Sequence, residues 1–279
     1  MANDPLEVQA LTIRHLVPGL GRVPRDLTKE GLSGLVASVL GIARAQVARG
    51  YHVALHGWRP AGASDGPRRY ELDGVAVHVT PGWPWARTRR VDGRVLAPLL
   101  AMSARSAAAD IVSVHSDPHL LLAPRARARV LHYHTPVPAV PAGLYRRLVQ
   151  QADLVVCCSE FVRRQVLARL EFPPERVAVV RNGVDLERFQ ERGTASAWSA
   201  ERQQWGVRPD EMVLLYVGAV VPEKGLLHLL RALRQVHQEH PCRLVVVGAA
   251  GLWPTPDNPH PDGADAYSAS VRMAGKDLP

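Results

Sequence analysis

Short apolar runs alternate with amphipathic helical patterns along most of this chain, and that alternation restricts its fold more than any other feature. The runs are bounded by Gly, Pro or polar residues, as is typical of strands buried in a sheet. Parallel strands need crossover helices, so the alternation predicts an α/β fold with a parallel sheet covered on both faces. The expected strands are 8–17, 51–56, 75–79, 110–115, 130–134, 154–158, 177–180, 212–217 and 243–247. The expected helices are 35–49, 95–109, 118–126, 142–151, 160–170, 224–240 and 266–273.

A polar stretch with poor periodicity divides this pattern. Residues 1–185 carry most of the alternation and predict a complete N-terminal Rossmann-like domain. Residues 186–208 are interpreted as a linker. Only two clear strands follow, so residues 209–279 predict a partial C-terminal Rossmann-like domain.

Two loops that follow strands have the character of phosphate sites. In Val213–Leu230, an apolar run ends at Gly218, and a helical pattern begins near Lys224. A strand that turns through glycine into a helix brings backbone N–H groups and the positive end of the helix dipole together. A second such loop, Gly31–Gly34, precedes the first long helix, but it lacks the G-x-G-x-x-G spacing of nicotinamide sites. Either loop can also be an ordinary turn before a helix.

Histidines mark the ends of two other expected strands. His132 and His134 alternate along one strand, so both face one side of the sheet. A metal pair needs a third ligand, which the sequence alone does not place, so we expect no metal site. His134 ends its strand beside Thr135 and is the better candidate for site chemistry, and His115 also ends a strand.

Composition and charge limit the classes of partner that this chain is expected to bind. The chain has 279 residues and a formal net charge of +8, which favours anionic ligands such as nucleotides or phospholipid head groups. We expect no nucleic-acid binding, because no aromatic stacking platform accompanies the arginines. The three cysteines, Cys157, Cys158 and Cys242, lack metal or disulfide spacing and indicate free thiols. No signal-peptide pattern or membrane-length apolar run is present, so we expect a cytoplasmic protein, with peripheral membrane contact left open.

Three motifs together resemble the family 4 retaining glycosyltransferases of the GT-B fold. They are His132–Thr135 (H-Y-H-T), Arg181–Asp185 (R-N-G-V-D) before the expected linker, and Val217–Gly225, which reads V-G-x-x-x-P-E-K-G. The resemblance covers the chain from about Val8 to Gly248. It implies two Rossmann-like domains and a nucleoside-diphosphate sugar donor of the UDP or GDP type, with no further cofactor.

The resemblance also implies roles for single residues. Lys224 and Gly218 would bind the donor diphosphate, and His134 would lie near the transferred sugar. Gly31 and Ser33 would approach the phosphates from the first domain. Thr135, in the same motif as His134, is assigned to donor binding. The acceptor would be lipid-linked or a polysaccharide, as in bacterial cell-surface glycan synthesis.

The chain departs from the family pattern in three places. Glu30 stands where the first glycine of a pair is usual, and Ala219 stands where an arginine is usual. The late glutamate pair of the second domain, one of which holds the nucleotide ribose, has no counterpart here. Two alternatives therefore remain open: a catalytically impaired fragment or remnant of such an enzyme, and a sugar-nucleotide epimerase of the same fold.

Overall fold

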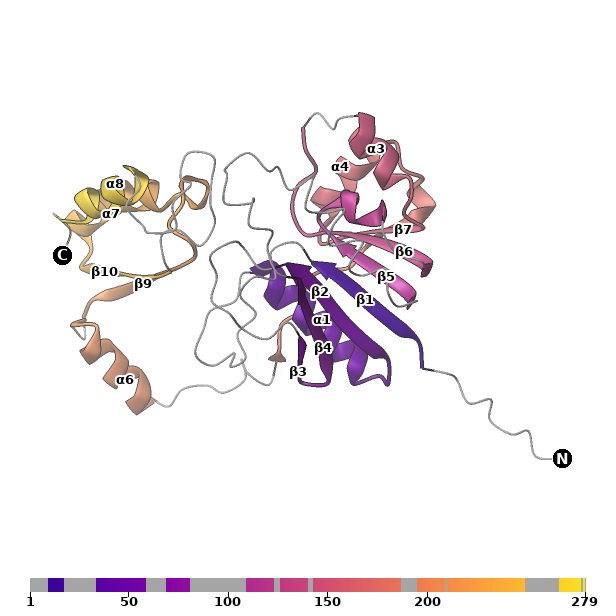
Figure 1. Ribbon diagram of the computed structural model, residues 1–279. Coiled ribbons are helices and arrows are strands. Elements are labelled where there is room, and N and C mark those ends of the chain that lie inside the picture. Colours follow the sequence, from indigo (N-terminus) through magenta and orange to yellow (C-terminus); the bar gives the residue numbers. More distant parts are fainter. Residues whose placement is uncertain are drawn as a thin grey trace. The chain divides into compact units, whose positions relative to one another are not determined.

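The structure is a computed structural model that describes ten ranges of the chain. They are residues 10–17, 34–58, 69–80, 109–122, 126–139, 143–186, 195–208, 210–248, 266–276 and 278. The chain divides into two compact units, Met1–Asp185 (unit 1) and Leu186–Pro279 (unit 2). Both contain strands and helices (Figure 1).

Unit 1 follows the predicted alternation closely. Its elements are β1 (Thr12–Val17), α1 (Gly34–Val47), β2 (His52–Trp58), β3 (Arg69–Leu72), β4 (Val75–Thr80), β5 (Ala109–His115), η3 (Pro118–Leu122), β6 (Ala126–Tyr133), α3 (Gly143–Val149), β7 (Leu154–Cys157), α4 (Glu160–Leu170), η4 (Pro174–Arg176) and β8 (Val177–Val179). The predicted helix 95–109 lies outside the described residues, except that Ala109 begins β5.

The strands of unit 1 form one sheet in the order β3-β4-β2-β1-β5-β6-β7-β8. All neighbours are parallel except β3, which pairs antiparallel with β4. The sequence prediction did not include β3. Its hairpin turns through Asp73 and Gly74, which both have positive φ, at 50° and 75°. An Asp-Gly pair between short strands is a strong local signal for such a turn.

Two hydrophobic clusters form the core of unit 1. One cluster packs α1, through Val36, Val39, Leu40 and Ala43, against β1, β2 and β4. The other joins β5, β6 and β7 to η3, α3 and α4. Ser159 caps α4 as predicted, because its Oγ accepts a hydrogen bond from the Val162 N–H at 3.2 Å.

Unit 2 contains α6 (Ala195–Gln204), β9 (Met212–Val217), η5 (Pro222–Lys224), α7 (Leu226–Glu239), β10 (Cys242–Val247) and α8 (Ala266–Gly275). β9 and β10 pair in parallel as a two-stranded sheet. Leu226, Leu230 and Leu233 of α7 are buried. α7 and α8 also pack together, and Arg234 of α7 donates to the Ala274 carbonyl at 3.2 Å. None of the helices in the described ranges is long and apolar enough to cross a membrane.

Two details of unit 2 differ from the sequence expectation. Residues 186–208 were expected to be a linker, yet they include α6. The guanidinium of Arg202 anchors this helix by donating to the carbonyls of Arg208 and Glu211, at 2.7 and 2.8 Å. The helix expected from Lys224 begins instead at Leu226. Gly225 has φ of 71°, in the left-handed region, and it separates the 3-10 turn that contains Lys224 from α7.

Candidate functional site

The sheet of unit 1 has a topological switch point between β1 and β5. The chain passes from β1 to β2 on one side and later places β5 on the other side of β1. In parallel α/β sheets, ligands bind outside the carboxyl ends of the strands at such a point. His115 is the last residue of β5, and His134 follows the last residue of β6. The switch point therefore lies where histidines end adjacent strands.

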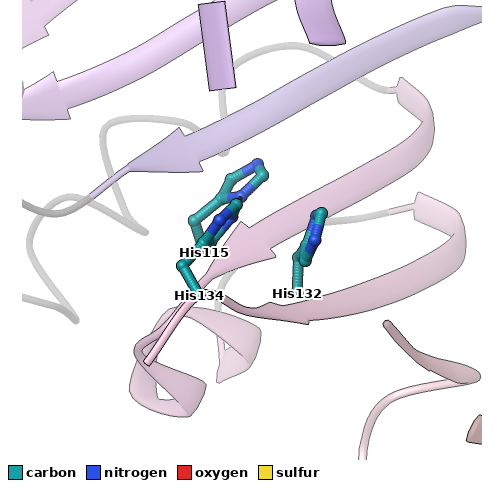
Figure 2. Close-up of side chains that lie close together, drawn as sticks. All are labelled: His115, His132 and His134. Carbon is teal, nitrogen blue, oxygen red and sulfur yellow. Dashed lines mark hydrogen bonds between the residues drawn. The ribbon is translucent and has the colours of Figure 1, made fainter. Parts of the chain in front are cut away.

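Four histidines from three strands meet on one face of the sheet. We call them the histidine cluster. Its members are His15 of β1, His115 of β5, His132 of β6, and His134, which follows β6. Gln46 of α1 bonds to His15, which places the cluster on the side of the sheet that α1 covers. The register agrees, because His115 lies beside His132 and residues two apart share a face. Figure 2 shows three of the rings close together.

Hydrogen bonds connect Gln46 and three of the four histidines into a chain. His15 Nε2 lies 2.7 Å from Gln46 Oε1, and His15 Nδ1 lies 2.9 Å from His115 Nε2. His115 Nδ1 in turn lies 2.8 Å from His134 Nε2. The rings of His132 and His134 stack, with centroids 4.1 Å apart. His15, His115 and His134 are thus held by hydrogen bonds to other elements, and His132 by stacking on His134.

Burial keeps these imidazoles neutral. It lowers the pKa of His15 to about 4, partly offset by the hydrogen bond to Gln46. Burial and the neighbouring histidines lower the pKa of His132 to about 3 and that of His115 well below its usual value. Burial also lowers the pKa of His134 to about 4, which the Asn182 side chain partly opposes. At neutral pH every ring therefore carries one proton and one lone pair.

The chain of bonds then fixes the position of each proton. Gln46 Oε1 can only accept, so His15 donates from Nε2 and accepts at Nδ1. His115 then donates from Nε2 to His15 and accepts at Nδ1 from His134 Nε2–H. The lone pair of His134 is therefore on Nδ1. This atom is buried and has no partner within hydrogen-bond distance, although the nearby Asn182 side chain influences the ring.

A strained residue lies directly after β5. Ser116 has φ of 62°, which is uncommon for a residue with a side chain, and its N–H donates to the His132 carbonyl at 2.9 Å. Its buried Oγ lacks a hydrogen-bond partner. Such a conformation persists only where the surroundings enforce it, and such positions concentrate at functional sites. The bond from Ser116 ties the ends of β5 and β6 together beside the cluster.

The residues predicted from sequence are distributed unevenly over the structure. His134 lies in the cluster, and the influence of Asn182 on its pKa joins the H-Y-H-T and R-N-G-V-D motifs in space. Thr135 is exposed, two residues after the end of β6. Gly31 and Ser33 lie outside the described residues. Gly218 and Lys224 belong to unit 2, which is considered by itself.

Backbone hydrogen bonds fix the loop after β9, one of them to β10. The Gly218 N–H donates to the Val247 carbonyl at 2.9 Å, and the Lys224 N–H donates to the Val221 carbonyl at 3.1 Å. Gly248 follows β10 beside Gly218, and a Cβ at Gly248 would collide with the Gly218 carbonyl oxygen. Two glycines therefore meet at the carboxyl end of this sheet, where the backbones approach too closely for a side chain at Gly248. Lys224 is exposed two residues before α7 begins.

Sequence reasoning missed several members of the cluster. His115 was noted at a strand end but was not assigned to the site, and His15 and Gln46 were not considered. His15 lies 100 residues from His115 and 31 from Gln46, so no local pattern connects them. Polar residues in otherwise apolar strands, such as His15 and Ser113, were the available signal, because a buried polar group needs a partner.

Comparison with known proteins gives a consistent result. A profile of Glycosyltransferase Family 4 matches residues 32–188, and a profile of Glycosyl transferases group 1 matches residues 199–273. A D-inositol 3-phosphate glycosyltransferase of Nocardioides sp. is 35% identical over 117 residues, which are 40% of this chain and 24% of that protein. The matched stretch thus spans about a quarter of the length of that curated relative.

Two solved structures illustrate the fold. A glycosyltransferase from Rickettsia africae superposes with a TM-score of 0.61 at 15% identity, covering 96% of this chain and 65% of that one. The Anabaena protein HepE in complex with UDP-glucose gives a TM-score of 0.63 at 18% identity, covering 95% of this chain and 65% of that one. These likenesses confirm the expected GT-B-like α/β fold. The Glycosyltransferase Family 4 profile matches more than half of this chain, so the chain belongs to that family.

Proposed function

We propose that this chain transfers a sugar from a nucleoside-diphosphate sugar, of the UDP or GDP type, to an acceptor with retention of configuration. The observation that carries the proposal is the site of His134. This residue lies at the switch point of a family 4 domain, with a buried lone pair on Nδ1 and the R-N-G-V-D motif beside it. HepE and a trehalose-6-phosphate protein of E. coli were solved with UDP-sugar ligands, which supports a donor of this class.

Each unit has a separate role in this proposal. In unit 2, Lys224, the backbone at Gly218 and the N-terminal end of α7 would stabilise the diphosphate as it gains charge on leaving. In unit 1, His134 would accept a hydrogen bond from a hydroxyl of the transferred sugar. Lys224 and backbone amides would take the part of a metal ion at the phosphates, so no cofactor is proposed there. Gly31, Ser33 and Thr135 remain proposed donor contacts.

The acceptor class and the cellular location are proposed from the charge of the chain. A lipid-linked or polysaccharide acceptor in bacterial cell-surface glycan synthesis fits the net charge of +8, which favours an anionic membrane surface. The cytoplasm, with peripheral membrane contact, is the matching location. The alternative of an impaired enzyme is favoured by Ala219, which is buried and supplies no charge where the family usually has an arginine. Product analysis would separate transfer from epimerisation.

Calorimetry with UDP and GDP tests the diphosphate role. We expect one of the two nucleotides to bind the full chain, and Lys224→Ala to weaken it about 10- to 100-fold. The reason is that losing one charge-assisted contact costs about 1.5–3 kcal/mol. The matched control is Lys276→Ala, which removes an exposed lysine just after α8 and should leave the affinity unchanged. Equal affinities of Lys224→Ala and the wild type would refute the assignment.

A transfer assay over a panel of donors tests the role of His134. We expect His134→Ala to lower turnover about tenfold or more while nucleotide affinity changes little, because the ring is assigned to the sugar and not to the diphosphate. A variant that loses nucleotide affinity and keeps its turnover would contradict this division of roles.

A further inference from the structure

The histidine cluster also has the composition of a transition-metal site. We propose that His115, His132 and His134 bind one first-row transition-metal ion of the Zn²⁺ class. Each residue can offer one ring nitrogen, and the three nitrogens lie within 4.8 Å of one another. The rings come from β5 and from the end of β6, and Figure 2 shows them gathered at one place. The sequence expectation of no metal considered only the two histidines of one strand, and the structure adds the third.

A buried nitrogen without a partner supports a ligand at this place. His132 is 5% exposed, and its Nε2 has no hydrogen-bond partner. A buried polar atom that gives up water without replacing it loses free energy, so this nitrogen lacks a partner that it needs. A metal bond to Nε2 of His132 would supply that partner.

The surrounding bonds resemble the support of a metal ligand. A metal-bound imidazole usually donates its other N–H to a fixed acceptor, which sets the tautomer and the ring orientation. His115 donates from Nε2 to His15, and His15 donates to Gln46, so Nδ1 of His115 faces the other two rings as a lone pair. His115 is therefore already oriented for binding.

The ligand chemistry selects the kind of ion. Three neutral imidazoles suit Zn²⁺, Co²⁺, Ni²⁺ or Cu²⁺, whereas Mg²⁺ and Ca²⁺ prefer oxygen ligands. Zinc–nitrogen bonds of about 2.0–2.1 Å in a tetrahedron separate two ligand atoms by about 3.3 Å. Nδ1 of His115 and Nε2 of His134 are 2.8 Å apart around a shared proton, and the three ligand nitrogens lie within 4.8 Å of one another, so binding needs adjustments of about 0.5 Å for that pair and up to about 1.5 Å for the widest pair. Binding would move the proton of His134 from Nε2 to Nδ1, so the metal-loaded protein would donate a hydrogen bond from Nδ1, whereas the metal-free protein accepts one there. Because histidine nitrogens would hold this ion, it would not be the kind of ion that neutralises a diphosphate.

Metal titration of the untagged, chelator-treated full chain tests this proposal without any need for transfer activity. We expect one equivalent of Zn²⁺ by calorimetry, and the visible absorption of nitrogen-coordinated Co²⁺ when Co²⁺ is used instead. His132→Gln should weaken binding at least tenfold. The matched control is His56→Gln, which replaces another buried histidine of the same sheet and should leave binding unchanged.

The outcomes are decisive in each case. No stoichiometric binding by the wild type, or equal binding by His132→Gln, would overturn the proposal. If His132→Gln does not fold by circular dichroism, X-ray absorption of the zinc-loaded wild type decides, with three imidazole ligands expected and fewer than three counting against the site.

Discussion

His56 shows at the scale of one residue how burial couples this protein to pH. It is buried on β2, its ring stacks on His78 with centroids 4.5 Å apart, and its Nε2 has no hydrogen-bond partner. Burial, His78, Arg14 and Arg69 lower the pKa of His56 to about 3. In the unfolded chain this pKa returns to about 6.5. Between pH 3 and pH 6.5, the unfolded state therefore binds a proton at His56, whereas the folded state keeps this ring neutral.

The expected result is a difference in acid sensitivity. The stability that depends on neutral His56 is fully present above pH 6.5 and is lost as the pH falls toward 3. Below pH 6, the free energy of unfolding should fall less steeply with pH in His56→Gln than in the wild type. The two slopes should differ by about 1.4 kcal/mol per pH unit. Urea titrations at pH 7, 6 and 5 measure this slope. The control is His52→Gln, at an exposed site that begins the same strand. Parallel curves for wild type and His56→Gln would contradict the argument.

At the scale of one element, the start of α4 depends on a single side chain. Ser159 has extended backbone angles, and its Oγ satisfies the Val162 N–H, which has no partner inside the helix. We expect Ser159→Ala to destabilise unit 1 by about 1 kcal/mol, and Ser159→Asp to retain most of the stability, because aspartate also caps. Thermal unfolding followed by circular dichroism compares the three proteins. An alanine variant as stable as the wild type would show that the cap contributes little.

At the scale of the whole molecule, the two units differ in how much sheet they bury. Unit 1 has an eight-stranded sheet with a core cluster on each side, whereas the described sheet of unit 2 has two strands. Leu215 and Val217 of β9 and Val247 of β10 are more than half exposed. A two-stranded sheet with little apolar cover has a low free energy of local opening.

We therefore expect amide hydrogen exchange to be uneven. Backbone amides of β9 and β10 should exchange at least tenfold faster than those of β5 and β6, because local opening of the smaller sheet exposes little additional apolar surface. Hydrogen exchange measured by mass spectrometry on the full chain compares the two sheets directly, and α1 serves as an internal reference within unit 1. Equal protection of both sheets would mean that unit 2 is stabilised by interactions outside its described sheet.

The sequence by itself determined the local elements and the family. Apolar runs bounded by Gly and Pro gave the strands, Ser159 gave the start of α4, and the three motifs gave the family 4 resemblance. These features are readable because strand and helix periodicity, caps and turns depend on residues a few positions apart. The Asp73–Gly74 turn of β3 was equally local, so that strand could have been predicted.

Only the tertiary structure decided what surrounds His134. The neighbours of β1 are β2 and β5, and this order brings His15 to His115 across 100 positions of sequence. Burial then lowers the pKa of each ring and keeps it neutral, and the acceptor Gln46 on α1 sets which nitrogen holds each proton. Strand order, burial and proton position all arise from long-range packing. For that reason one histidine could be proposed from the sequence, while the cluster that orients it could not.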